Sequence, residues 1–515
     1  MNRFKYFILS GTLLTAVTLS LRTLSVAFNV YLSNKIGAIA MGLFGLISTV
    51  YNFGITIATS GINLATTRLV SEELGKADKN DISLISVLKK SISYAIFFGV
   101  ISSLIIFVSA ESVGVKILGD SRTVTPIKIS ALTLPFIAVS SALSGYFTAI
   151  RKVYKNAIVQ TVGQFTRIYL CTAFLAIFNS DKVESACMAI VFGGALSEIS
   201  AFLMQFILYI FDKRNNENTS HTPLQRGKEI RKKLLSITLP VAFSSYVRSG
   251  LVTLEHLLIP WGLKKSGSTQ EKSLAAYGTV QSMVFPLILF PSAISSSFAG
   301  LLIPEMAQAN AESDNARIKA IAQRVFKSIF VFSIGTSGLI ICFSYELGNT
   351  FYPNTNASTY ILMLAPLIPV MYMDTSVDSI LKGLGKQTLT MIINVIDATL
   401  SVILVFFLLP RFGIIGFIIT VYFTELLNAS LSLTYLLRVC DVKIKVFSWI
   451  GKPLLCIFAS TWLSRKLLSS FEIVATNRYE ALLHVLMGAV IYILSLFVVG
   501  VIRFNDVKNS LKNLT

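Results

Sequence analysis

Long apolar runs recur from one end of the chain to the other, and they constrain its fold more than any other feature. A helix needs roughly 20 such residues to cross a bilayer, and about fourteen runs reach that length. Only 14% of the residues are charged and 54% are hydrophobic, whereas about a quarter of an average soluble domain is charged. The runs are centred near Thr18, Tyr51, Phe98, Phe136, Thr166, Ser197, Val247, Leu289, Phe332, Ile368, Val395, Ile419, Phe458 and Tyr492. The sequence therefore predicts an all-α integral membrane protein.

The basic residues are sorted between the two sides of this predicted bundle. With an even number of spans, most of the 45 lysines and arginines fall on the side that carries both termini. Positive charge stays on the cytoplasmic side of membranes, so both termini are predicted to be cytoplasmic. The net charge of +19 is spread over loops and not gathered on one face, which argues against a nucleic-acid partner.

The opening segment of the chain is repeated weakly after the longest basic connection. Ser10 aligns with Ser236 and Arg22 with Arg248, and two later segments follow in the same order. Two copies with an even number of spans enter the membrane from the same side, as parallel repeats do. A central cavity between two lobes is the expected result. The predicted domains are a six-helix lobe at 1–212, a basic cytoplasmic linker at 213–233, a second six-helix lobe at 234–440, and two additional helices with a short cytoplasmic tail at 441–515.

Two arginines stand inside predicted spans at corresponding places in the two copies. An arginine at mid-membrane costs roughly 2.5–3.5 kcal/mol on insertion scales, so something must compensate for it. Arg22 lies on a polar helical stripe, which is expected to line a wet cavity. The guanidinium fork suits phosphate. Snorkelling or a structural ion pair, for Arg248 with Glu255, remains an alternative. The candidate substrate-binding residues are Arg22, Asn29, Asn52, Asn63, Arg248 and Glu255.

A second polar group falls on the tenth and eleventh predicted spans. Its members are Asp374, Asp378, Asn394 and Asp397. Carboxylate and amide oxygens on neighbouring helices can hold Na⁺ or relay H⁺, so these residues are candidates for ion coupling. The alternative is a simple ion pair between Asp378 and Lys382, four residues apart.

A further acid and base, Glu198 and Arg167, lie on the fifth and sixth predicted spans, and we expect them to form a structural pair. Local motifs for catalysis or cofactors are absent. The three histidines and five cysteines have no metal-ligand spacing, and the cysteines suit small buried hydrophobes. GLGKQT at Gly383 lacks the earlier glycine of a phosphate loop, because Ile380 occupies that position. The connections are too short for an active site, so we expect neither an enzyme nor a cofactor other than a coupling Na⁺ or H⁺.

Taken together, these features resemble the multidrug/oligosaccharidyl-lipid/polysaccharide exporter superfamily, and its polysaccharide branch most of all. The features are the arginine-bearing first span, the segment GINLATTRLVSEELGKAD from Gly61, the copied halves and the two extra C-terminal helices. The resemblance covers almost the whole chain.

The resemblance implies a flippase for a polyprenyl-diphosphate-linked saccharide, specifically a peptidoglycan precursor for spore cortex, in a cell membrane with envelope synthases as possible partners. In related lipid II flippases, cavity arginines bind the diphosphate, and Arg22 matches the first of these. A second arginine and an aspartate are unmatched, because Phe28 and Asn29 stand near those places. The last two helices, 458–468 and 482–499, would correspond to a groove for the lipid tail. Alternatives are a cation-coupled drug antiporter of the same superfamily and a non-transporting scaffold for envelope synthases.

Overall fold

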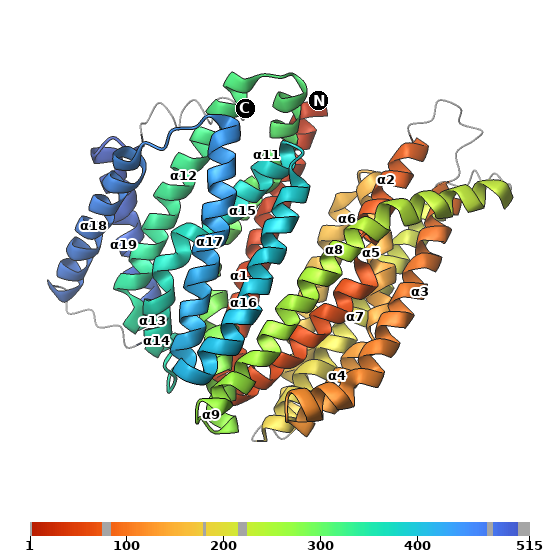
Figure 1. Cartoon of the computed structure of the whole chain (residues 1–515), viewed down its shortest axis with the longest axis horizontal. Coiled ribbons are helices and arrows are strands. Elements are labelled where there is room, and N and C mark those ends of the chain that lie inside the picture. The colour runs from red at the N-terminus through yellow and green to blue at the C-terminus, as the bar shows by residue number, and fades with distance from the viewer. Residues whose placement is uncertain (1–2, 75–83, 179–181, 215–223, 471–476, 503–515) are drawn as a thin grey trace. The chain divides into compact units, whose positions relative to one another are not determined.

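The computed structural model describes residues 3–74, 84–178, 182–214, 224–470 and 477–502 (Figure 1). Within these ranges the chain is helical and contains no strand. Eight of the described helices are long and apolar enough to cross a membrane, or up to nine if the bent pair Ser121–Ala131 and Leu134–Ala149 forms one span. The prediction of an all-α membrane protein is confirmed. The count of fourteen spans stays a prediction.

The helices divide into two compact units, which we call unit 1 and unit 2. Unit 1 contains Arg22–Ala38 and the chain from Gly262 onward, together with residues before position 16. Unit 2 contains Ile39–Trp261 and the short stretch Ala16–Leu21. The units do not coincide with the predicted lobes 1–212 and 234–440. The end of the first predicted span belongs to the unit that holds most of the second copy, and residues 234–261 belong to the unit that holds the first. Residues 215–223 of the predicted linker 213–233 lie outside the described residues, and its last part, 224–233, belongs to α8.

The first helix, α1 (Arg3–Thr59), is interrupted where the chain leaves unit 1. Gly37 has φ 77° and ψ 172°, which is not helical, and only glycine adopts this conformation without a steric penalty. The break therefore divides α1 into the first two predicted spans.

Unit 2 is built on helices that pack in pairs, notably α6 with α7 and α5 with both α2 and α3. Helix α8 (Leu224–Lys265) lies along the second part of α1, where the Tyr246 hydroxyl donates to the carbonyl of Ile57 at 3.0 Å. The Ser249 hydroxyl likewise donates to Thr56 at 3.1 Å. The other helices of this unit are α2 (Ile62–Leu74), α3 (Leu84–Glu111), η2 (Ser112–Ile117), η3 (Ser121–Thr123), α4 (Val124–Ala131), α5 (Leu134–Ala149), α6 (Val153–Ile177) and α7 (Val183–Arg214).

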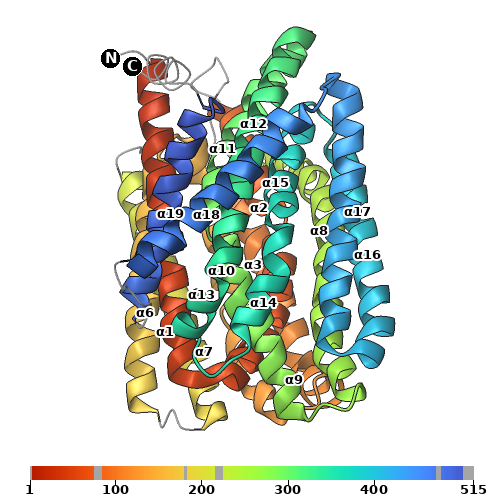
Figure 2. The same ribbon diagram turned by 90° about the vertical axis from the view of Figure 1, so that its left-hand side faces the viewer.

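The last two helices of unit 1, α18 and α19, pack against α12 (Figure 2). The Tyr492 hydroxyl of α19 donates to the carbonyl of Val331 in α12 at 2.7 Å. A Cβ atom on Gly335 would lie 2.2 Å from the Tyr492 ring, so the close approach of α19 to α12 requires glycine there. The helices of this unit are α9 (Gln270–Tyr277), η4 (Gly278–Val284), α10 (Phe285–Leu289), α11 (Ser292–Ala311), α12 (Asn315–Cys342), α13 (Ser344–Phe351), α14 (Ala357–Leu364), η5 (Ala365–Leu367), α15 (Ile368–Gly383), α16 (Gln387–Phe412), α17 (Ile414–Cys440), η6 (Phe447–Gly451), α18 (Lys452–Ser470) and α19 (Arg478–Val498).

Candidate functional site

Arg22 lies in the part of α1 that belongs to unit 1, and its side chain is half-buried. Within the described part of the chain, its guanidinium makes no ion pair or hydrogen bond. The guanidinium interacts electrostatically with the hydroxyl of Tyr372 on α15. That hydroxyl donates to the carbonyl of Ile288 at 2.6 Å. Arg22 is thus a cation inside a membrane-crossing helix, and none of the described residues places an anion against it.

The same face of α1 carries a second unsatisfied polar group. The Oδ1 atom of Asn29, two turns beyond Arg22, is buried and accepts no hydrogen bond from the residues that the structure describes. A buried acceptor without a donor costs about 1–3 kcal/mol. This stretch of α1 therefore carries polar groups that do not contribute to the packing of unit 1, as expected of a surface that binds a polar ligand.

The other predicted substrate-binding residues lie in unit 2, and their surroundings differ from one another. Asn63 donates to the carbonyl of Ser141 at 3.3 Å, so its amide holds α2 against α5. Asn52 and Arg248 are exposed. Arg248 and Glu255, both in the described ranges, form no ion pair with each other.

The four candidate ion-coupling residues all lie in unit 1, on the adjacent helices α15 and α16. Asp378 forms an ion pair with Lys382 at 3.3 Å, the alternative that the spacing left open. Asn394 donates to its own helix, at the carbonyl of Thr390, at 2.8 Å. Among the described residues, no group of three or more His, Cys, Asp or Glu could hold a metal ion.

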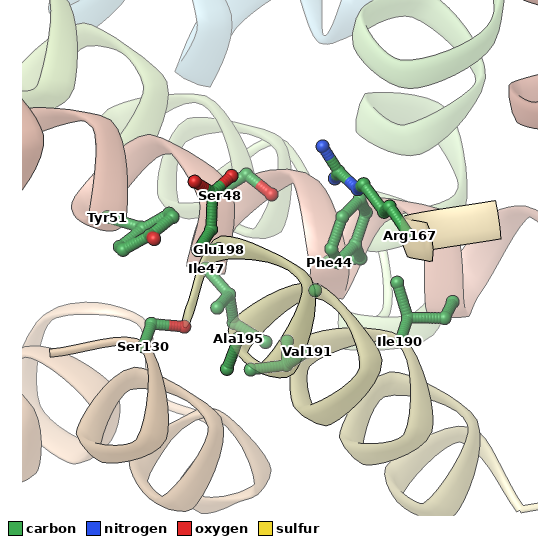
Figure 3. Close-up of a pocket in the computed structure, with 11 residues that line it drawn as sticks. Phe44, Ile47, Ser48, Tyr51, Ser130, Arg167, Ile190, Val191, Ala195 and Glu198 are labelled. Atoms are coloured by element: carbon green, nitrogen blue, oxygen red, sulfur yellow. The ribbon is translucent and has the colours of Figure 1, made fainter. Parts of the chain in front are cut away.

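Unit 2 contains a small cavity among α1, α4, α6 and α7 (Figure 3). Its polar lining includes Arg167 from α6, Glu198 from α7, and Ser48, Tyr51 and Ser130. The volume is about 60 Å³, which holds a few water molecules but is far below the roughly 300–1,000 Å³ of a small-molecule site. The cavity is therefore too small for a saccharide.

The predicted pair between Arg167 and Glu198 is not a direct contact. Both side chains enter this cavity from adjacent helices, yet no ion pair joins them within the described residues. The thiol of Cys171, one turn beyond Arg167 along α6, donates to the carbonyl of Ile190 at 3.5 Å. Because the two charges face one cavity without touching, water is the natural intermediary.

The sequence did not reveal a second charged cluster of unit 2, formed where α7 ends. Asp212 is 3% exposed and accepts hydrogen bonds from Lys152 and from Lys155, the latter at 2.8 Å. The Tyr146 hydroxyl donates to its other oxygen at 3.2 Å. In the sequence, the spacing of Lys152 and Lys155 at the start of a span could have indicated a charged cluster. That spacing did not indicate Asp212 as their partner.

Comparison with known families gives two matches. The family described as polysaccharide biosynthesis protein matches residues 9–309, more than half of the chain. The family MatE matches residues 266–407.

Individual relatives cover most of the chain at low identity. Stage V sporulation protein B of Bacillus subtilis (strain 168) is 24% identical over 450 residues, which is 86% of this chain and 86% of that protein. Lipid II flippase MurJ of the same organism is 24% identical over 431 residues, covering 77% of this chain and 76% of the relative.

Solved structures share the fold. A lipid II flippase MurJ in an inward closed conformation superposes with a TM-score of 0.68 at 14% identity, over 94% of this chain and 98% of that one. An inward-facing multidrug resistance MATE family transporter gives a TM-score of 0.63 at 13% identity, over 83% and 98%. None of these four proteins is named as an enzyme.

Proposed function

The chain belongs to the polysaccharide biosynthesis protein family, and from this premise we propose that it is a flippase. Its cargo is a polyprenyl-diphosphate-linked saccharide, which it moves from the cytoplasmic to the outer leaflet of the cell membrane. It performs no covalent chemistry on that cargo.

The observation that carries this proposal is the state of Arg22. A guanidinium in a membrane-crossing helix is costly unless an anion or water compensates for it, and the described part of unit 1 supplies no ion pair to it. A diphosphate supplies that anion and matches the planar fork bidentately. The Oδ1 of Asn29, which has no partner among the described residues, provides an acceptor for sugar hydroxyls on the same helix face. Arg248, the counterpart in the second copy, is the second arginine that we expect the headgroup to meet.

The mechanism that fits a duplicated bundle is alternating access. With both termini cytoplasmic, a membrane potential negative inside drives an anionic headgroup outward by about 2.3 kcal/mol per charge per 100 mV. Coupling to Na⁺ or H⁺ through the acids of α15 and α16 is a second drive that we propose for transport.

The finer identity of the cargo is also a proposal. Two relatives are named as sporulation proteins, stage V sporulation protein B and sporulation protein YkvU of Bacillus subtilis, and a third as a lipid II flippase. The lipid II flippase name supports a peptidoglycan precursor as the cargo, and the sporulation names support a role in sporulation. Delivery to the spore cortex and partnership with envelope synthases are part of our proposal.

A drug antiporter is the competing function. The MatE match over residues 266–407 and the MATE family neighbours favour it. Against it, the span residue Arg22 would repel a cationic drug, and no carboxylate pairs with it in the described residues.

The test is leaflet exchange of labelled lipid-linked precursors by purified protein in vesicles, with drug efflux measured on the same preparation. We expect Arg22→Ala and Arg248→Ala to reduce exchange at least about 30-fold, since truncating one partner of a buried charged contact costs about 2–5 kcal/mol. Arg68→Ala, which removes an exposed arginine paired with Glu72, should exchange normally. Normal exchange by both span variants, or drug efflux without lipid exchange, would refute the flippase.

A further inference from the structure

None of the residues that line the cavity of unit 2 has a role in the proposed function. The cavity lies wholly within unit 2, whereas Arg22 and the acids of α15 and α16 lie in unit 1. It also contains one acid and one base, Glu198 and Arg167, in a volume of only about 60 Å³. An isolated charge in such surroundings costs several kcal/mol, and a direct Arg–Glu contact is the usual remedy.

That remedy is absent here, although the two side chains share the cavity (Figure 3). The few water molecules that the cavity can hold must therefore solvate the Glu198 carboxylate. A carboxylate that contacts water in place of a guanidinium can gain and lose a proton without breaking an ion pair.

Tyr51 lines the cavity but its proton is committed elsewhere. The Thr133 hydroxyl donates to the carbonyl of Ser130 at 2.8 Å. The 2.6 Å contact between the Tyr51 and Thr133 hydroxyls therefore has Tyr51 as donor, because the Thr133 proton is already used. Tyr51 consequently has no proton to offer Glu198.

The remaining groups that face Glu198 from each neighbouring helix are few. They are Ser48 of α1, Ser130 of α4 and Arg167 of α6. Arg167 is the one fixed charge among them, and it compensates the ionised carboxylate across the cavity.

We propose that this cavity is a proton-binding site in which Glu198 is the protonated group, water is the donor and acceptor, and Arg167 sets the balance between the two states. The proton forms an O–H bond to one carboxylate oxygen and returns to cavity water on release. Binding changes the net charge of the cavity from zero to +1, so unit 2 exists in two charge states.

A metal cation is the less suitable ligand for this cavity. Na⁺ needs a shell of several oxygens, and the cavity lining offers one carboxylate, two serine hydroxyls and a tyrosine oxygen. The guanidinium of Arg167 also repels it. A proton needs only the carboxylate.

The site can be tested by proton binding alone, without any transport measurement. Infrared difference spectra of the full-length protein in lipid nanodiscs would be recorded from about pH 5 to about pH 9, with and without Na⁺, over the range in which a shifted carboxyl titrates. We expect a titrating band of a protonated carboxyl that disappears in Glu198→Gln. In Arg167→Gln, the midpoint should move up by about one pH unit or more, because a nearby cation favours the ionised form.

Two controls keep the result interpretable. Asp378→Asn should leave the band unchanged, because that acid is paired and lies in the other unit. Size-exclusion chromatography would verify that Glu198→Gln and Arg167→Gln are folded, and Arg167→Lys should restore the midpoint. A band that survives Glu198→Gln, a midpoint unaffected by Arg167→Gln, or a midpoint that follows the Na⁺ concentration would each overturn the proton site. None of these outcomes depends on whether the chain is a flippase.

Discussion

Arg22 of unit 1 and Arg167 of unit 2 are both arginines of helices that the sequence predicts to cross the membrane, and their surroundings differ. Arg167 shares a small cavity with the carboxylate of Glu198. Arg22 has no ion pair or hydrogen bond within the described residues and lies near a neutral tyrosine hydroxyl. A charge that is compensated by another residue of the same unit is part of the structure of that unit. A charge without such a partner is available to bind an anionic ligand.

The cluster at Asp212 is the opposite extreme from Arg22. There the acid and two lysines are in direct hydrogen-bonded contact, and the acid is almost fully buried. Unit 2 thus contains charge clusters closed by direct contact, such as the one at Asp212, and one acid and base that face a small cavity without contact. In unit 1, Arg22 has no ion pair among the described residues. The stability of variants should follow this order.

The largest effect is expected from Asp212→Ala. It leaves the Nζ atoms of Lys152 and Lys155 without their carboxylate, and breaking a buried pair costs about 3–5 kcal/mol. The thermal unfolding midpoint in detergent should fall strongly. Asp378→Ala, which removes the acid of a partly exposed pair with Lys382, should cost no more than about 1 kcal/mol. Equal midpoints for the two variants would contradict the ranking.

An intermediate effect is expected from Glu198→Leu. Arg167 then lacks an opposite charge, but cavity water still solvates it, so we expect a loss of about 1–3 kcal/mol. The double variant Glu198→Leu with Arg167→Leu should be more stable than Glu198→Leu alone, since no charge remains uncompensated. Additive losses in calorimetry would show that the two residues act independently.

Arg22→Leu should not destabilise the protein. No partner is left unpaired, and removal of a span charge lowers the insertion cost, so the unfolding midpoint should stay constant or rise while lipid exchange is lost. A destabilisation comparable to that of Glu198→Leu would mean that Arg22 is compensated within the protein after all.

The smallest effect concerns an exposed pair at the end of α17. The hydrogen bond from Lys319, 2.6 Å long, lowers the pKa of Asp441 below its ordinary value. The stabilisation is therefore present above the ordinary carboxyl pKa and is lost as the pH falls through the lowered value. The wild type and Asp441→Asn should differ slightly in unfolding midpoint at neutral pH and converge in acid. A constant difference at all pH values would exclude this ion pair as its cause.

The extra helices show what sequence reasoning could and could not supply. Their apolar runs predicted two spans. Both α18 and α19 are helices, but of these two described helices α19 alone is long and apolar enough to cross a membrane. The fit of Tyr492 against Gly335 was not predictable, because it joins residues far apart in the chain through shape alone.

The same limit applies to the candidate sites. Sequence spacing located Arg22, Arg167 and Glu198 inside spans, because helical periodicity and apolar composition are local properties. It also predicted a direct contact between Arg167 and Glu198, and the structure has a cavity there instead, since the distance between two helices depends on every side chain between them.

By itself, the sequence determined the class of the protein: recurring apolar runs with few charges can satisfy their backbone only as helices in a membrane. The tertiary structure alone decided which unit each helix joins and which charges meet. The stretch Arg22–Ala38 groups with the second copy, and 234–261 with the first, because packing between helices is set by surface shape and polar contacts, and chain order does not encode either.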